Sequence, residues 1–218
     1  MAASSAPPEP ADRLSGHHVA GDASPAIDRV GLDRVGVVGG GTMGSGIVHA
    51  ALAAGIPVTL VEADAAALAR AEALVRRSLD GAEARGKLGA AIGGPTAPTT
   101  AAAALDALTL TTDRTALAEV RFVIEAVPEI LELKSGLLRD LEAHLTDDAV
   151  LATNTSSLSL AALGAGLRRP QRFVGTHFFN PVPVQVLLEL VRTAATDAQT
   201  LDRARALARL LRKEVVEV

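Results

Sequence analysis

An apolar stretch near the C-terminal end of the chain contains one imidazole and one carboxylate that could together move a proton. The stretch is THFFNPVPVQVLLELV, residues 176–191, and its two ionisable residues are His177 and Glu189. Imidazole has a pKa of about 6.5 in water, so it can accept a proton near neutral pH. A carboxylate bonded to the other ring nitrogen would fix the tautomer and stabilise the imidazolium. From the spacing alone, a buried structural histidine beside a surface glutamate is the favoured interpretation.

The elements around this pair favour an interaction between the two side chains. His177 lies in one β-like run, 172–180, and Glu189 lies in the next run, 184–191. Pro181 and Pro183 separate the two runs and predict a turn. We therefore expect neighbouring strands to bring the imidazole and the carboxylate within hydrogen-bonding distance.

A second candidate site is the glycine-rich sequence GVVGGGTMGSG, which contains Gly39-x-Gly41-x-x-Gly44. It follows a β-like run (33–39), opens a helical stretch (42–55) and precedes a second β-like run (57–63) that contains Glu62. In this context the motif predicts a dinucleotide site, with the pyrophosphate at the positive N-terminal end of the helix. The residues that we expect to bind the cofactor here are Gly39, Gly41, Thr42, Met43, Gly44 and Glu62.

The acidic residue at the end of the second run indicates which dinucleotide is preferred. Glu62 would accept hydrogen bonds from the ribose hydroxyls and would repel a 2′-phosphate, so NAD is favoured over NADP. FAD is a lesser alternative, because no later segment resembles a flavin domain. The alternative to a dinucleotide site is a glycine-rich turn with a surface glutamate.

The rest of the chain supplies the elements that must position these residues. From residue 33 onward, β-like runs alternate with helical stretches, which predicts one doubly wound α/β domain over 33–218. Residues 1–32 are rich in Ala, Ser and Pro and predict a flexible tail. The tail contains His17 and His18, which lack further ligands, and we expect no metal site.

Composition excludes several classes of function. The 218 residues carry a net charge of −4, contain no Cys and no Trp, and hold only 2% aromatic residues. These features argue against nucleic-acid binding, membrane binding and thiol chemistry. The uncharged segment 35–61 is long enough to span a bilayer, but its glycines and Pro57 divide it into short elements. Because the N-terminus lacks a secretory signal, we expect a cytoplasmic protein.

Four motifs in order resemble the NAD-binding domain of the 3-hydroxyacyl-CoA dehydrogenases, including the 3-hydroxybutyryl-CoA type. The motifs are VGVVGGGTMGSGI, VIEAVPEILELK, ATNTSSLSL and RFVGTHFFNPVPV…LLELV, and the resemblance covers about 33–218. It implies a Rossmann-like, mostly parallel sheet with a helical excursion after the second strand. It also implies NAD-dependent oxidation of an (S)-3-hydroxyacyl-CoA to the 3-oxoacyl-CoA, or the reverse reduction.

The resemblance also implies roles for single residues. His177 matches the catalytic base, Glu189 matches its partner carboxylate, and Ser156 matches the serine that touches the substrate hydroxyl. Asn154 lies beside Ser156, near cofactor and thioester. The remaining matches are Glu129 and Lys134, which would contact the nicotinamide half of NAD, and, less securely aligned, Ser78 and Arg85, which would contact CoA.

Each of these matches has a structural alternative. Ser156 could cap the helix that follows, and Lys134 could be a surface lysine paired with Glu129 or Glu132. The excess of positive charge over 65–87 could attract the phosphates of CoA or could form a solvated helix face. His49 and His144 lie in helical stretches, and we interpret both as structural.

The family continues beyond the segment that corresponds to Val218. The resemblance implies that a C-terminal helical domain, through which the family dimerises, is missing from these 218 residues. Activity could then be reduced. The rival functions are a sugar-acid dehydrogenase of the same superfamily and a catalytically incomplete NAD-binding protein.

Overall fold

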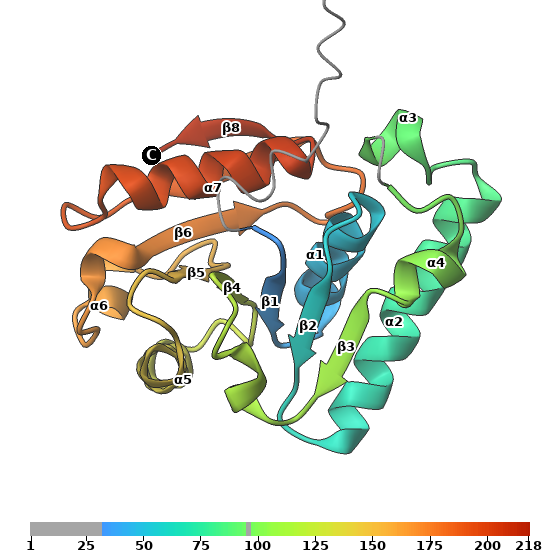
Figure 1. Cartoon of the computed structure of the whole chain (residues 1–218). Helices are drawn as coiled ribbons and strands as arrows, with labels where there is room; N and C mark the ends of the chain where they lie inside the picture. The colour runs from blue at the N-terminus through green and yellow to red at the C-terminus, as the bar shows by residue number, and fades with distance from the viewer. Residues whose placement is uncertain (1–31, 95–96) are drawn as a thin grey trace, which may run out of the picture.

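The computed structural model describes residues 32–94 and 97–218, which form an eight-stranded sheet with helices on both faces (Figure 1). The strand order is β3-β2-β1-β4-β5-β6-β7-β8. All neighbouring strands are parallel except β6 and β7, which are antiparallel. This is the predicted doubly wound, mostly parallel, Rossmann-like sheet.

The strands are β1 (Val35–Val38), β2 (Val58–Val61), β3 (Leu108–Thr111), β4 (Phe122–Glu125), β5 (Val150–Thr153), β6 (Phe173–Phe178), β7 (Leu187–Val191) and β8 (Glu214–Glu217). The α-helices are α1 (Thr42–Ala53), α2 (Ala65–Ala84), α3 (Ala90–Gly93), α4 (Ala101–Leu105), α5 (Leu131–His144), α6 (Leu160–Gly164) and α7 (Ala198–Leu210). Two 3₁₀ turns, η1 (Arg114–Leu117) and η2 (Pro170–Arg172), complete the described elements.

Two hydrophobic clusters cover the two faces of the sheet. One face packs against α1, α2, α4 and α7, and the other packs against η1, α5 and α6. The central strands β1, β2, β4 and β5 are buried along their whole length, as expected when helices cover both faces of a parallel sheet. Hydrophobic burial on both faces therefore holds the strand ends that carry the site residues.

The strand order reverses between β1 and β4, and this reversal sets the place of the site. In open α/β sheets, ligands bind beyond the carboxyl ends of the strands at such a switch point. The glycine-rich loop follows β1, the 126–130 loop follows β4 and the 154–159 loop follows β5. All three loops therefore meet at the same edge of the sheet.

The elements predicted from the sequence are present, and several short ones were missed. The predicted helix over about 64–88 ends earlier, at Ala84, and the turn-rich break contains α3 and α4. Almost all of the predicted tail, with His17 and His18, lies outside the described residues. Leu32 is the exception: it is fully buried and belongs to the core.

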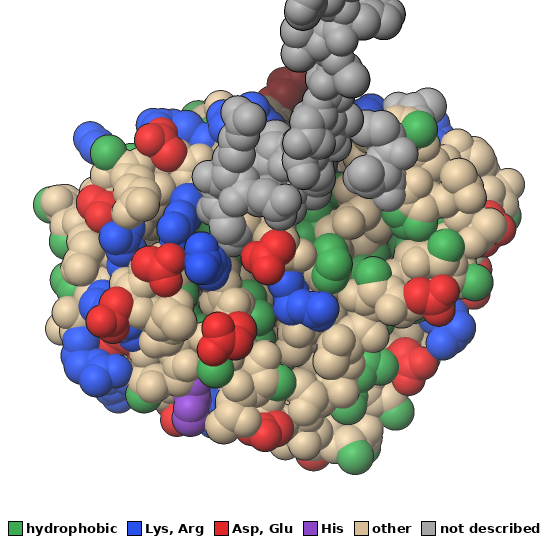
Figure 2. All heavy atoms as spheres, in the orientation of Figure 1, with side chains coloured by type: hydrophobic (Ala, Val, Ile, Leu, Met, Phe, Trp, Pro, Cys, Tyr) green, Lys and Arg blue, Asp and Glu red, His purple; other side chains and the backbone are tan. Residues whose placement is uncertain are grey.

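Two further findings concern the charge of the surface and the hydropathy of the helices. On the face drawn in Figure 2, acidic and basic side chains of the described residues are interspersed. Among those residues, no helix is both long and apolar enough to cross a membrane.

Candidate active site

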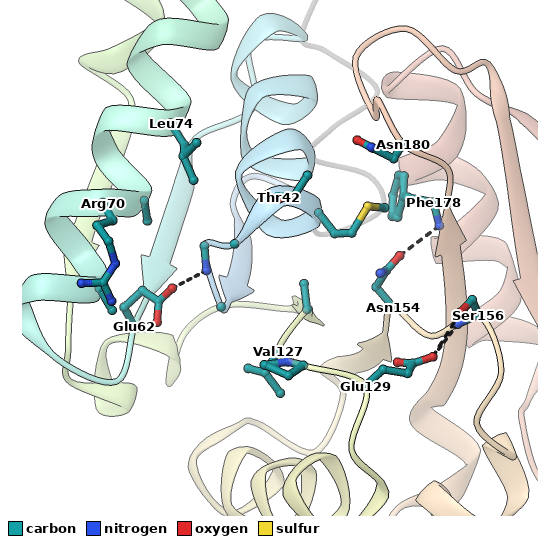
Figure 3. A pocket seen from close by; sticks show the side chains of 18 of the residues that line it. Thr42, Glu62, Arg70, Leu74, Val127, Glu129, Asn154, Ser156, Phe178 and Asn180 are labelled. Atoms are coloured by element: carbon teal, nitrogen blue, oxygen red, sulfur yellow. Dashed lines mark hydrogen bonds between the residues drawn. The ribbon is translucent and has the colours of Figure 1, made fainter.

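A cavity of about 790 Å³ opens at the switch point of the sheet (Figure 3). Segments far apart in the sequence line it, and they include most of the residues that the sequence singles out. The lining residues from these predictions are Gly39, Gly41, Thr42, Met43, Glu62, Glu129, Asn154, Ser156 and His177. The cavity therefore brings the dinucleotide motif and the proton-transfer candidate together.

The glycine-rich loop has the geometry that a pyrophosphate needs. Gly39 has φ of +93°, a conformation that side chains disfavour, and a Cβ on Gly44 would lie 1.7 Å from the carbonyl oxygen of Gly39. A Cβ on Gly41, by contrast, would meet nothing within 4 Å, so the backbone there faces open space. No side chain caps α1, and its first N–H groups are left for an anion. These residues fit the phosphates of a dinucleotide.

Glu62 and Arg70 line the part of this cavity beside the glycine-rich loop and α2. The carboxylate of Glu62 accepts hydrogen bonds from the backbone N–H of Gly40 at 2.6 Å and of Ala63 at 3.1 Å. These bonds fix the carboxylate beside the glycine-rich loop, where ribose hydroxyls could bind it. Arg70 of α2 also lines this end of the cavity, and sequence reasoning missed it because a helical arginine has no local signal.

Glu129 binds the loop that follows β5 through several hydrogen bonds. Its Oε1 accepts hydrogen bonds from the Thr155 hydroxyl at 2.6 Å and from the Ser156 and Ser157 backbone N–H groups at 2.8 and 3.2 Å. Partial burial acts to raise the pKa of Glu129, but these hydrogen bonds and the charge of Lys134 lower it below its ordinary value. Glu129 is therefore an anion that holds Ser156 at the rim of the cavity.

The alternative role of Ser156 as a helix cap is wrong. The cap of α6 is Ser159, whose hydroxyl accepts a hydrogen bond from the Ala162 N–H. Thr155 accepts a hydrogen bond from the Leu158 N–H, and this bond closes the turn before the helix. Ser156 is left exposed beside Glu129.

Asn154 links two strands at the floor of the cavity. Its Oδ1 accepts a hydrogen bond from the backbone N–H of Phe178 at 3.0 Å, as Figure 3 shows. Its side-chain amide is therefore oriented with Nδ2 as the remaining donor group. An amide donor here could bind a carbonyl oxygen of cofactor or substrate.

His177 and Glu189 form the predicted pair. They lie directly opposite each other in the antiparallel β6–β7 pairing, and His177 Nδ1 lies 2.8 Å from Glu189 Oε2. Because residues opposite in a sheet project to the same face, the pairing dictates this contact. The Phe179 ring packs beside the imidazole, with ring centroids 4.3 Å apart. The expected hydrogen-bonding distance is confirmed.

Lys134 lies in the interior of the protein, at the end of β4. It is fully buried, and its Nζ donates to Glu125 Oε1 and Oε2 at 2.8 and 3.0 Å and to the Asn154 carbonyl at 2.9 Å. The interpretation as a surface lysine is wrong, because the buried carboxylate at the end of β4 needs a counter-ion. Lys134 does not line the cavity, but its ammonium group donates to the backbone carbonyl of Asn154, which does.

A second cavity, of about 720 Å³, lies at the other end of α1. Here the Ser78 hydroxyl lies 2.7 Å from His49 Nδ1, and Arg85 lies at the rim. Two lysines, Lys87 and Lys213, add positive charge. The two predicted CoA contacts, Ser78 and Arg85, therefore share one cavity, whereas the surface arginine Arg76 pairs with Glu72 on the exposed face of α2.

Metal ligands are a separate matter. Within residues 32–94 and 97–218, no group of three or more His, Cys, Asp or Glu side chains is placed to hold a metal ion.

The doubly wound sheet, the glycine-rich loop and the anchored acidic residue after β2 define a dinucleotide-binding domain of the dehydrogenase type. The match to a known family is specific. Residues 34–218 match the family described as 3-hydroxyacyl-CoA dehydrogenase, NAD binding domain. The chain belongs to this family, and the prediction of NAD as cofactor is confirmed.

Relatives extend the comparison. The chain is 42% identical over 195 residues to a 3-hydroxybutyryl-CoA dehydrogenase of Mycobacterium tuberculosis, covering 88% of this chain and 64% of that protein. It is 38% identical over 157 residues to a 3-hydroxyadipyl-CoA dehydrogenase of Escherichia coli, covering 72% of this chain and 31% of that protein.

A solved structure agrees with these relatives. The crystal structure of the (S)-3-hydroxybutyryl-CoA dehydrogenase from Ralstonia eutropha superposes with a TM-score of 0.78 at 36% identity, covering 86% of this chain and 63% of that one. The chain thus spans less than two thirds of the length of these relatives.

Proposed function

We propose that this chain carries the cofactor half and the proton-transfer residues of an NAD-dependent 3-hydroxyacyl-CoA dehydrogenase. The reaction is oxidation of an (S)-3-hydroxyacyl-CoA to the 3-oxoacyl-CoA, or the reverse reduction, in acyl-CoA metabolism. The observation that carries the proposal is the His177–Glu189 pair, whose imidazole lines the same cavity as the glycine-rich loop.

The roles of the residues follow from their hydrogen bonds. With Nδ1 bonded to Glu189, His177 has Nε2 as the nitrogen that can accept the hydroxyl proton of the substrate. Glu189 stabilises the imidazolium that forms. Bound NAD supplies the acceptor for the hydride. Asn154 and Ser156 lie on the same cavity and hold the oxygen atoms of the substrate through their amide and hydroxyl groups.

The second cavity supports a CoA thioester as the substrate. CoA carries phosphate groups, and Arg85, Lys87 and Lys213 place positive charge around this cavity. Ser78 offers a hydroxyl group between them. The two cavities border opposite ends of α1, so an extended substrate could reach from one to the other. A sugar acid would leave the cationic cavity without a ligand.

The names of the relatives support the same substrate class. They are dehydrogenases of 3-hydroxybutyryl-CoA and 3-hydroxyadipyl-CoA, which share the 3-hydroxyacyl thioester and differ in the acyl tail. We therefore propose the thioester as the common element that is recognised.

The test is a turnover assay on the protein as its gene encodes it. NADH formation is measured with (S)-3-hydroxybutyryl-CoA, with free 3-hydroxybutyrate and with a sugar acid, each with NAD and with NADP. We expect turnover with the thioester and NAD, and slow or no turnover with the CoA-free acids.

The other outcomes separate the rivals. Preference for the sugar acid would overturn the acyl-CoA proposal in favour of another dehydrogenase of the superfamily. NADH binding without turnover of any of the substrates would support a non-catalytic NAD-binding protein.

A further inference from the structure

An ion pair between Glu125 and Lys134 lies beneath the first cavity. Both side chains are fully buried. The ammonium group of Lys134 has three acceptors, which are the two carboxylate oxygens of Glu125 and the carbonyl oxygen of Asn154. The carboxylate also accepts hydrogen bonds from the Val127 N–H at 2.6 Å and the Thr153 hydroxyl at 2.5 Å. Every donor of the lysine is therefore used.

Stability alone is a weak reason for such a pair. Burying two charges removes their hydration, and replacing a buried ion pair by uncharged groups of similar volume is often neutral or stabilising. Removing one partner is costly, because the other charge is left alone. The reason for the ion pair should therefore lie in the groups that it holds in place.

Two of the three groups bonded to the pair belong to loops that line the cavity. Val127 belongs to the loop after β4, and Asn154 begins the loop after β5. A second carboxylate, that of Glu129, lies 3.6 Å from the Lys134 ammonium. Asn154 in turn accepts the hydrogen bond from Phe178, the residue after His177. One buried ammonium group thus joins the loops on the cofactor side to the strand that carries the proposed base.

Another buried carboxylate shows what a purely structural anchor looks like in this chain. Glu142 accepts hydrogen bonds from the backbone N–H groups of Arg168 and Arg169 at 2.8 and 2.7 Å, and its side chain is 6% exposed. It fixes the loop between α6 and η2 and lines neither of the two cavities. Glu142 matches Glu125 in type, burial and backbone bonding, and differs in location.

We propose that Glu125 and Lys134 are positioning residues that hold Asn154 and the 126–129 loop in register with His177. Neither residue touches the substrate in this role. The turnover part rests on the proposed function, whereas the effect on cofactor binding does not.

The test is the double variant Glu125→Gln/Lys134→Met. Glutamine keeps an acceptor for Val127 and a partner for Thr153, and methionine fills the volume of the lysine stem without a charge. The Asn154 carbonyl loses its donor. We expect a thermal midpoint close to that of the parent and a kcat lowered about tenfold to hundredfold, because small misplacements of reacting groups are costly. The KM for the acyl-CoA should change by less than about twofold, because the CoA-binding cavity is untouched.

Cofactor affinity is measured separately by NADH fluorescence. We expect the Kd of the double variant for NADH to rise. The matched control is Glu142→Gln, which should lower the thermal midpoint and leave kcat and the Kd at the parent values.

A double variant that is folded, with kcat and Kd both within about twofold of the parent, would overturn the proposal. If the double variant does not fold, Thr153→Val replaces it, because it removes one donor to Glu125 with no change in volume. That variant should lower kcat and raise the NADH Kd while Glu142→Gln does not, and parent values for both would also overturn the proposal. If the parent lacks turnover, the proposed function fails, and the NADH Kd still decides the positioning role.

Discussion

Two histidines in this chain make nearly the same hydrogen bond and sit in opposite electrostatic surroundings. His177 Nδ1 lies 2.8 Å from a carboxylate oxygen of Glu189, and His49 Nδ1 lies 2.7 Å from the hydroxyl oxygen of Ser78. Each histidine lines one of the two cavities. Bond geometry therefore does not separate a proton-transfer histidine from a structural one.

Burial and the charge of the neighbours do separate them. His49 is 5% exposed, and burial together with the charges of Arg85 and Lys213 lowers its pKa to about 4. It is therefore neutral at physiological pH and can only share a hydrogen bond with Ser78. His177 is half-buried, and its Nδ1 faces the carboxylate of Glu189. We therefore propose that the base is the histidine that faces a carboxylate, His177, and not the histidine that lies beside cations.

The largest effect should come from His177→Gln. Glutamine keeps a polar group of similar size but cannot take a proton, and general-base catalysis contributes about 10² to 10⁴ in rate. We expect kcat to fall about 10³-fold in the turnover assay while the Kd for NADH, measured by fluorescence, changes little. A variant that retained more than about a tenth of the parent kcat would remove His177 from the role of base.

Glu189→Gln should have the next largest effect. The amide can still hydrogen-bond to Nδ1, but it carries no charge to stabilise the imidazolium and can select the wrong tautomer. We expect kcat to fall about 10²-fold with little change in KM for either substrate. If kcat fell no more than after a surface substitution, the His177–Glu189 pair would be only a packing contact.

Much of the site followed from the sequence where neighbours in space are also neighbours in the chain. Gly39, Gly41, Gly44 and Glu62 lie in one βαβ unit, so their spacing fixes their geometry. His177 and Glu189 occupy adjacent strands joined by the segment 179–186, and their pairing required only that the two runs be antiparallel. Local pattern was sufficient in both cases.

The rest depended on contacts between distant segments. Lys134 is buried because the end of β4 holds Glu125, and no periodicity in α5 announces a buried lysine on its first turn. The second cavity is lined by α1, the end of α2 and the segment after α7, which are far apart in the sequence. The helical pattern around His49 could not reveal this cavity, and it predicted only a structural role. The choice of Ser159 over Ser156 as the cap turned on the path of the chain after β5.

A smaller effect, confined to the second cavity, should follow Arg85→Ala. Arg85 forms no ion pair with another described residue, so its charge is available to an anionic ligand. A hydrogen bond to a charged group contributes about 1.5 to 3 kcal/mol, so we expect the KM for the acyl-CoA to rise about tenfold or more with kcat little changed. The measurement is initial rate against acyl-CoA concentration.

Arg76→Ala is the matched control for that experiment. Arg76 lies on the same helix and pairs with Glu72 at 3.0 Å on the exposed face. Its loss should leave the KM unchanged, since exposed ion pairs contribute little. Equal effects of the two substitutions would show that the charge of α2 acts from a distance and that the second cavity does not bind CoA.

The smallest effect on turnover, and the clearest effect of pH, should come from His49→Gln. The folded protein holds the pKa of His49 at about 4, below the value of 6.5 expected when the chain is unfolded. Between these values the unfolded chain binds the extra proton, so the contribution of His49 to stability is fully present above pH 6.5 and is lost as the pH falls toward 4. From pH 7 to pH 4 this loss amounts to up to about 3 kcal/mol.

Urea unfolding of the parent and of His49→Gln at pH 7, 6, 5 and 4 measures this contribution. All other titrating groups are common to both proteins, so the difference in their slopes isolates His49. We expect the variant to lose less stability on acidification, with kcat at pH 7 within about twofold of the parent because a neutral amide can still bond to Ser78. His144→Gln, a substitution of a half-buried histidine in α5, is the control for replacing a histidine by glutamine outside the second cavity. Parallel curves for the parent and His49→Gln would mean that the fold does not disfavour a proton on His49, and the electrostatic contrast drawn between the two cavities would then be lost.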